Sequence, residues 1–343
     1  MHVCTPSTTQ RRSDRRAATR EPLILVFDFG GTKHAAALLK PGQRHWQEYR
    51  RVLAPPGADA KTDLEIARSL GRELLQGRTP LAIGVSFGGP VNAATGEVRL
   101  SHHVPGWENI PLSRILEDEF GAPAAVDNDA NVAALGEYRF GAGRGYNSLF
   151  YITVSTGVGG GWILNGKLWQ GTEGMAGEIG HTVVEPNGPQ CLCGKRGCVE
   201  RLASGPYMAG DVRSQLLEQP ERGEVLRTLV GGKLDAITGQ TVSLAAEAGD
   251  EVARAAIAKA GWALGTGIGN VANLINPQLF VLGGGVTKAG EQFWQVVRQT
   301  AETTALPEVH FQVIPAELGD EAPLWGAVAL AEDLLALSYA SAS

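Results

Sequence analysis

The chain of 343 residues contains no uncharged apolar run that approaches the ~20 residues needed to cross a membrane. Its N-terminus also lacks the apolar core of a secretory signal peptide, so we expect a cytoplasmic protein with no membrane partner. Thirty basic against 36 acidic residues give a net charge of −6, which excludes a broadly basic surface for nucleic acid. The composition, 43% hydrophobic and 19% charged, is that of a globular protein.

Glycine is abundant. The 45 glycines among 343 residues are about 13%, nearly twice the usual ~7%. They are clustered rather than periodic, which excludes a collagen-like chain and indicates many close backbone approaches. Residues 1–21 differ from the rest: five arginines stand among polar residues, which predicts a disordered basic tail. A nucleic-acid arm and a misassigned start codon are alternative interpretations of this tail.

Two similar hairpins are expected. Leu23–Phe27 and Ala35–Leu39 are short apolar runs joined by a Gly-Gly turn, and Ser148–Val154 and Trp162–Leu164 repeat that layout. Two such hairpins, each opening an α/β half, suggest a duplicated architecture with a cleft between the halves. Further strands are expected over 81–85, 124–126 and 279–282, and helices over 63–75, 112–120, 130–140, 251–275 and 324–337. Residues 205–245 suggest helices and loose turns without identifiable chemistry.

Three glycine turns follow buried strands directly, where backbone N–H groups can approach an anion that a Cβ would block. The first carries Asp28 and Lys33, the second Ser155 and Thr156, and the third is Gly283 to Gly285. Two facing hairpins would grip a polyphosphate, and Asp28 could hold magnesium directly or through water. None of the turns is a Walker loop or a dinucleotide-binding fingerprint. Because hairpins need glycine anyway, one such turn alone would be weak support.

Three cysteines, Cys191, Cys193 and Cys198, lie within eight residues, and His181 stands ten positions upstream. Free thiols and a disulfide are alternatives, although disulfides are rare in the cytosol. Three thiolates and one imidazole satisfy a tetrahedral zinc ion, which would be structural because no ligand position remains open. We therefore expect a zinc knot here.

Carboxylates lie on both sides of this knot in the sequence and also after the strand expected over 124–126. Glu178 and Glu200 flank the knot and suit a polyhydroxylated ligand, although any single glutamate could be ordinary surface acid. Asp127-Asn128-Asp129-Ala130-Asn131 lies between an expected strand and an expected helix. A helix N-cap explains one of these polar residues. Asp129 could instead take a proton from a substrate hydroxyl, with Asn128 bonding to neighbouring hydroxyls.

Together these motifs resemble the ROK family of bacterial sugar kinases and sugar-responsive repressors. The resemblance runs from about Leu23 to the C-terminus and is carried by the segments 28–33, 127–137, 155–161, 178–181, 191–200 and 282–286. It implies an α/β protein of the actin-like (ribonuclease-H-like) ATPase fold, with two α/β domains around a central cleft. We expect an N-terminal domain over 22–140, with the C-terminal helix 322–340 packing back on it, and a C-terminal domain with the zinc knot over 141–321.

The resemblance implies an ATP-dependent hexose kinase with Asp129 as the general base for the sugar 6-hydroxyl. It implies sugar contacts from Asn128, Asp129, Glu178, His181 and Glu200, with His181 also ligating zinc. The expected ATP-binding residues are Asp28, Gly30, Gly31, Thr32, Lys33, Thr156, Gly157, Gly159 and Gly284. Magnesium is expected with ATP, and homodimerisation is implied by the resemblance alone.

Glucose is the expected hexose. Fructose, mannose, allose, N-acetylglucosamine and N-acetylmannosamine stay open, as do donors other than ATP. His102 and His103 precede Pro105-Gly106-Trp107 where the family often has an asparagine, so the hydroxyl pattern recognised could differ. The competing hypothesis is a non-catalytic sugar-sensing regulator. Only 22 residues precede Leu23, too few for a winged helix-turn-helix domain, and the base Asp129 is present, so an enzyme is expected.

Overall fold

The computed structural model describes residues 21–31, 33–101 and 104–342. The predictions made for the basic tail, Thr32, His102 and His103 therefore lie outside the described residues. In the described part of the chain, no helix combines the length and apolar character that crossing a bilayer requires.

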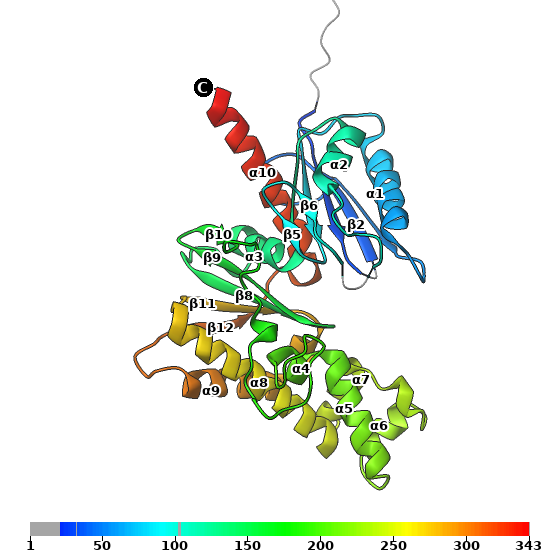
Figure 1. The fold of residues 1–343 in the computed structure, drawn as a ribbon, viewed down its shortest axis with the longest axis vertical. Coiled ribbons are helices and arrows are strands. Elements are labelled where there is room, and N and C mark those ends of the chain that lie inside the picture. The colour runs from blue at the N-terminus through cyan, green and yellow to red at the C-terminus, as the bar shows by residue number, and fades with distance from the viewer. Residues whose placement is uncertain (1–20, 32, 102–103, 343) are drawn as a thin grey trace, which may run out of the picture.

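Two five-stranded sheets form the two lobes of the molecule (Figure 1). In the first, strand order is β3-β2-β1-β4-β7: β1, β2 and β3 run antiparallel, while β1, β4 and β7 are parallel. In the second, the order β10-β9-β8-β11-β12 repeats the same pattern of directions. The predicted duplication and both predicted hairpins, β1–β2 and β8–β9, are thus confirmed.

The central strands β1, β4, β8 and β11 form where the sequence is continuously apolar, because parallel central strands are covered on both faces. All six residues of β1 are buried, Asp28 included. The strands are β1 (Ile24–Phe29), β2 (Lys33–Leu39), β3 (Glu48–Leu53), β4 (Ala82–Phe87), β5 (Val91–Asn92), β6 (Glu97–Val98), β7 (Ala124–Asn128), β8 (Leu149–Val154), β9 (Val158–Leu164), β10 (Lys167–Trp169), β11 (Leu279–Gly283) and β12 (Gln312–Pro315).

Helices cover both faces of each sheet. The α-helices are α1 (Ala60–Leu75), α2 (Leu112–Phe120), α3 (Asp129–Phe140), α4 (Val199–Ala203), α5 (Gly205–Glu218), α6 (Glu224–Leu229), α7 (Gly239–Glu247), α8 (Glu251–Ile275), α9 (Glu291–Thr304) and α10 (Ala322–Ala342). Short 3₁₀ turns are η1 (Ile179–His181), η2 (Leu234–Ala236), η3 (Gly285–Lys288) and η4 (Gly319–Glu321). The helices expected from periodicity are confirmed, whereas α9 was not predicted.

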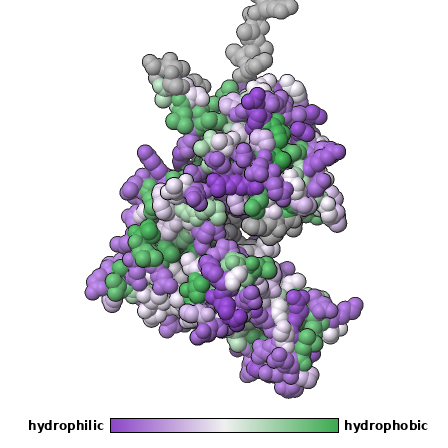
Figure 2. All heavy atoms as spheres, viewed as in Figure 1, coloured by the Kyte–Doolittle hydropathy of each residue, from purple (hydrophilic) through white to green (hydrophobic). Residues whose placement is uncertain are grey.

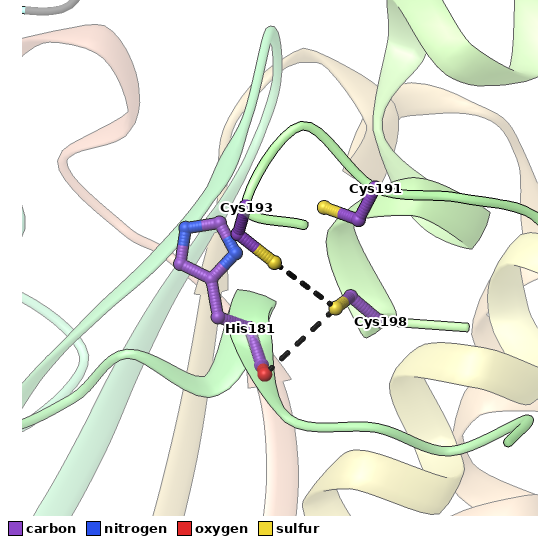
Figure 3. Close-up of side chains that lie close together, drawn as sticks. All are labelled: His181, Cys191, Cys193 and Cys198. Carbon is purple, nitrogen blue, oxygen red and sulfur yellow. Dashed lines mark hydrogen bonds between the residues drawn. The ribbon is translucent and has the colours of Figure 1, made fainter. Parts of the chain in front are cut away.

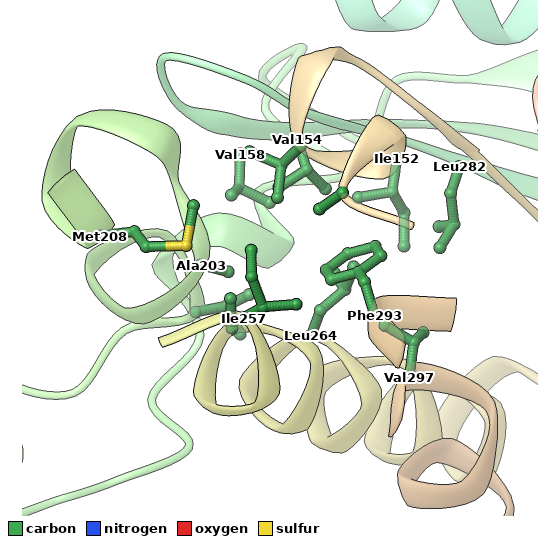
Figure 4. Close-up of a cluster of buried hydrophobic side chains, with 14 of the residues drawn as sticks. Ile152, Val154, Val158, Ala203, Met208, Ile257, Leu264, Leu282, Phe293 and Val297 are labelled. Atoms are coloured by element: carbon green, nitrogen blue, oxygen red, sulfur yellow. The ribbon is translucent and has the colours of Figure 1, made fainter. Parts of the chain in front are cut away.

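Three hydrophobic clusters divide the core. The first lies between the first sheet and α1 and α2, and the second between the second sheet and α4, α8 and α9. Figure 4 shows part of the latter, where Phe293 and Val297 of α9 meet strand residues such as Leu282. In the third cluster α3 and α10 pack between the two sheets. Because α3 packs on β8 and β9, and α10 on β1 and β4, this helix pair joins the lobes.

Candidate active site

The carboxyl ends of β1, β4 and β7 meet at one edge of the first sheet, because these strands are parallel. At that edge Asn128 ends β7, and Asp129 begins α3. Asn128 is the N-cap of α3, since its Oδ1 accepts from the N–H of Ala130 at 3.0 Å. Its Nδ2 donates to the carbonyl of Gly89 at 3.1 Å, which ties the cap to the turn after β4.

Asp129 is a partly buried carboxylate at this edge. Burial raises the pKa of Asp129 to about 6, and the nearby carboxylates of Asp28 and Glu178 act in the same direction. The N–H of Ala130 also donates to Oδ1 of Asp129, at 2.9 Å, and this hydrogen bond lowers the pKa of Asp129 and so opposes the rise. A side chain at Gly88 would lie 3.8 Å from Oδ2, so the turn after β4 borders the carboxylate. A carboxylate of this kind is ionised at neutral pH and more basic than an ordinary aspartate.

The second hairpin reaches the same place from the other lobe. A side chain at Gly159 would touch Cβ of Ala130 at 3.5 Å, and one at Gly161 would overlap the carbonyl of Ala130. Glu200, which lies in the first turn of α4, accepts the N–H of Val158 at 2.9 Å through Oε2. A Cβ at Gly157 would lie only 2.8 Å from that oxygen, so glycine there permits the approach of Glu200.

Glu178 reaches this hairpin through the turn η1, which it precedes. Gly180 in that turn packs so closely on Val158 that a Cβ would lie 2.0 Å from the carbonyl oxygen of Val158. The structure thus brings Asp129, Glu178 and Glu200 together around one short stretch of β9. His181 is the last residue of η1, which follows Glu178, and Cys198 is the N-cap of α4, which carries Glu200. The expected zinc knot therefore adjoins both carboxylates.

The first glycine turn connects β1 to β2 beside Asp129. The N–H of Gly30 donates to the carbonyl of Lys33 at 3.1 Å, and the N–H of Gly88 to the carbonyl of Phe29 at 2.9 Å. Asp28 is 8% exposed, and burial raises its pKa while the charge of Lys33 partly offsets that rise. Gly31, in the same turn, is exposed. The exposed turn at Gly31 can present backbone N–H to a phosphate, while Lys33 offers one ammonium and Asp28 one carboxylate to the phosphate and its cation.

The third glycine turn lies against the second. Gly284 has a φ of 91°, and a Cβ there would lie 2.4 Å from the carbonyl oxygen of Val154. Beside these turns opens a cleft of about 750 Å³. Thr156 and Gly285 form one side of it, and the other side comes from α5, η2 and α7. All lining residues of this cleft belong to the second lobe; separately, the surface is hollowed between the two lobes in Figure 2. The lining residues from this second side, which sequence reasoning missed, include Gly205, Pro206, Arg213, Asp235, Thr238, Gly239 and Ser243.

His181, Cys191, Cys193 and Cys198 form a compact cluster in which every ligand atom lies within 4.8 Å of the others (Figure 3). The Sγ atoms of Cys193 and Cys198 are 3.5 Å apart, near the ~3.8 Å edge of a tetrahedron with ~2.3 Å zinc–sulfur bonds. Nδ1 of His181 is buried and has no hydrogen-bond partner among the described residues. The three cysteines are free thiols. This donor set and the orphaned nitrogen fit zinc.

The chain is similar in sequence to known sugar kinases. A glucokinase of Streptomyces coelicolor is 35% identical over 315 residues, 91% of this chain and 98% of that protein. A glucokinase of Halalkalibacterium halodurans is 40% identical over 251 residues, 71% and 74% of the two chains. An N-acetylmannosamine kinase of Shigella flexneri is 32% identical over 309 residues, 90% and 98% of the two chains.

Among solved structures, a ROK family glucokinase from Streptomyces griseus in complex with glucose and AMPPNP superposes with a TM-score of 0.78. It is 35% identical, and the match covers 91% of this chain and 99% of that one. Two α/β lobes of one strand order, joined by a central helix pair around a cleft, are the actin-like ATPase fold. The ROK family model matches residues 24–334, and the chain belongs to the ROK family.

Proposed function

We propose that the protein is a hexose kinase that transfers the γ-phosphoryl group of ATP to the 6-hydroxyl of glucose. The proposal rests above all on the surroundings of Asp129: a carboxylate with a raised pKa, bordered by the turn at Gly88 and followed by Ala130, which packs on glycines of the second lobe. Two of the relatives are glucokinases, and one solved relative holds glucose and AMPPNP. Since an N-acetylmannosamine kinase also matches over most of the chain, the choice of glucose is the finer part of the proposal.

In the proposed reaction Asp129 accepts the proton of the 6-hydroxyl while the new O–P bond forms and the bond to the β-phosphate oxygen breaks. A pKa near 6 suits this role, because the base is ionised at neutral pH yet holds a proton better than an ordinary aspartate. Glu178, Glu200, His181 and the second amide N–H of the Asn128 side chain would orient the other hydroxyls. Such transfers depend mainly on positioning and charge neutralisation.

The phosphates would lie between the two hairpins. Backbone N–H groups of Gly31, Thr156 and Gly157 would donate to them, and Lys33 would neutralise charge. Asp28 would hold magnesium, directly or through water, and that cation supplies neutralisation of the transferring group. The adenosine would occupy the cleft between Gly285, which follows Gly284, and α7. We propose that zinc, held by His181, Cys191, Cys193 and Cys198, supplies a purely structural link that orients Glu178 and Glu200.

A coupled assay of ADP release across glucose, fructose, mannose, allose, N-acetylglucosamine and N-acetylmannosamine tests this proposal. We expect the highest kcat/KM with glucose. A higher value for another sugar would overturn the choice of glucose and keep the kinase. Sugar binding without ADP release from any of them would instead indicate a sugar-sensing regulator. Homodimerisation stays a prediction, which sedimentation of the purified chain can test.

A further inference from the structure

The chain passes between the two lobes twice, and both passages meet the same helix. After α3 the first crossing, residues 141–148, leads to β8; after β12 the second crossing, residues 316–321, leads to α10. The N-terminal end of α3 carries the proposed base Asp129. Its last turns carry Glu137, which belongs to a motif whose role the proposed reaction leaves open.

The carboxylate of Glu137 binds both crossings. Its side chain is fully buried. Oε2 accepts the N–H of Ala142 at 2.9 Å and that of Glu317 at 3.2 Å, and Oε1 accepts the N–H of Leu318 at 2.8 Å. One side chain of α3 therefore satisfies three backbone donors from segments that are about 175 residues apart in the sequence.

The backbone around the Glu137 carboxylate leaves space for it. A Cβ at Gly141 would lie 2.1 Å from Oε2, so only glycine leaves room for the side chain there. The backbone carbonyl of Glu137 also accepts the N–H groups of Gly141 and Gly143, at 3.0 and 2.9 Å. At the surface, the guanidinium of Arg144 donates to the carboxylate of Glu317 at 3.1 Å, which links the crossings a second time. Burial raises the pKa of Glu137, and its three backbone hydrogen bonds oppose that rise.

A displacement of the C-terminal end of α3, where Glu137 lies, would move Asp129 at the other end of the helix. Asp129 and Glu137 are eight residues apart on one helix, about 12 Å along its axis at ~1.5 Å per residue. At the N-terminal end, Ala130 packs directly on Gly159 and Gly161 of the second lobe. The relative placement of Asp129 and the second hairpin therefore depends on how α3 is held against both crossings.

We propose that Glu137 is a positioning residue, which ties both interlobe crossings to α3 and so aligns Asp129 with the phosphate-binding hairpin of the second lobe. It touches no reacting atom. The inference rests on the proposed kinase reaction for its effect on rate, whereas its effect on the crossings can be measured without turnover.

The decisive variants are Glu137→Gln and Glu137→Asp. Both carboxylate oxygens face N–H donors, and glutamine would set an NH₂ group against one of them. We expect Glu137→Gln to lower kcat ~10–100-fold at saturating hexose and ATP, with both KM values within ~3-fold of the wild type. Glu137→Asp keeps two acceptor oxygens and should restore most of the lost kcat. Amide exchange in Glu137→Gln should be faster at 141–148 and 316–321.

Asp250→Asn is the matched control. Asp250 is also a buried carboxylate with three backbone donors, from Val252, Ala253 and Leu226, but it caps α8. Its replacement should lower thermal stability while leaving kcat within ~2-fold. If Glu137→Gln behaves like this control, its role is structural only and the proposal is overturned. If the wild type phosphorylates no hexose, the proposed function fails; unchanged exchange at the crossings in Glu137→Gln would then still refute the positioning role.

Discussion

Replacing Asp129 by asparagine is expected to change activity and stability in opposite directions. Asparagine keeps the size of the side chain but can neither accept a proton at neutral pH nor carry a charge. Loss of a general base costs ~10²–10⁴ in rate, so kcat should fall by that factor. In the wild type, kcat/KM should fall about tenfold per pH unit below the pKa of about 6, because the protonated carboxyl cannot act as a base.

The stability gain follows from the same pKa. The folded value is about 6 against an ordinary 3.8, and a difference of about 2.2 at ~1.36 kcal/mol each is about 3 kcal/mol. Asp129 is partly exposed, so solvent screening reduces this to about 1–2 kcal/mol. Because the folded pKa is the higher one, the ionised carboxylate destabilises the fold above pH 6. That penalty shrinks as the pH falls from about 6 to about 4.

Thermal unfolding of both proteins at about pH 7.5 and about pH 4.5, beside the ADP-release assay, measures these effects. Asp129→Asn should unfold several degrees higher at the upper pH, and the difference should shrink at the lower one. Asp118→Asn is the control, since this carboxylate on α2 is 69% exposed and pairs with Arg114 at the surface. An Asp129→Asn variant with more than about a tenth of the wild-type kcat would refute the assignment of the base.

Three further predictions concern the metal, the nucleotide and the sugar. Cys191→Ser should lower bound zinc from about one per chain to well below that, by elemental analysis, whereas Cys4→Ser should not. Gly284→Ala should raise the KM for ATP ~10-fold or more, because its Cβ would meet a carbonyl oxygen at 2.4 Å; Gly210→Ala on α5 should leave it unchanged. Glu200→Gln should raise the KM for glucose ~10-fold and leave that for ATP nearly unchanged, and the reverse pattern would contradict its sugar-binding role.

Local patterns in the sequence were enough to predict the strands that carry the candidate site. Leu23 to Phe27 is an uninterrupted apolar run, and such a run can only be a buried strand or helix; its length and the Gly-Gly turn select the hairpin. The helix α8 was predicted at its observed ends, Glu251 and Ile275, and the structure shows that Asp250 caps it. The three cysteines lie so close in sequence that their meeting in space needed little from the rest of the fold.

Other features had no local signal. The edge strand β3 is largely exposed and polar, and α9 follows a glycine turn without a side-chain cap, so neither was predicted. Residues 205–245 showed no chemistry as a sequence, yet α5, η2 and α7 form one side of the cleft. Their role arises because the fold sets them opposite Thr156 and Gly285.

The sequence by itself therefore determined the central strands, the main helices and the glycine turns between strands, and it placed three cysteines close enough to meet. All of these depend on neighbours within a few residues. The tertiary structure alone decided that Asp129 lies beside Glu178, and that Glu137 holds Ala142 and Leu318 at once. Burial and the meeting of distant backbone donors are properties of the packed chain, because they depend on residues that only the fold brings together.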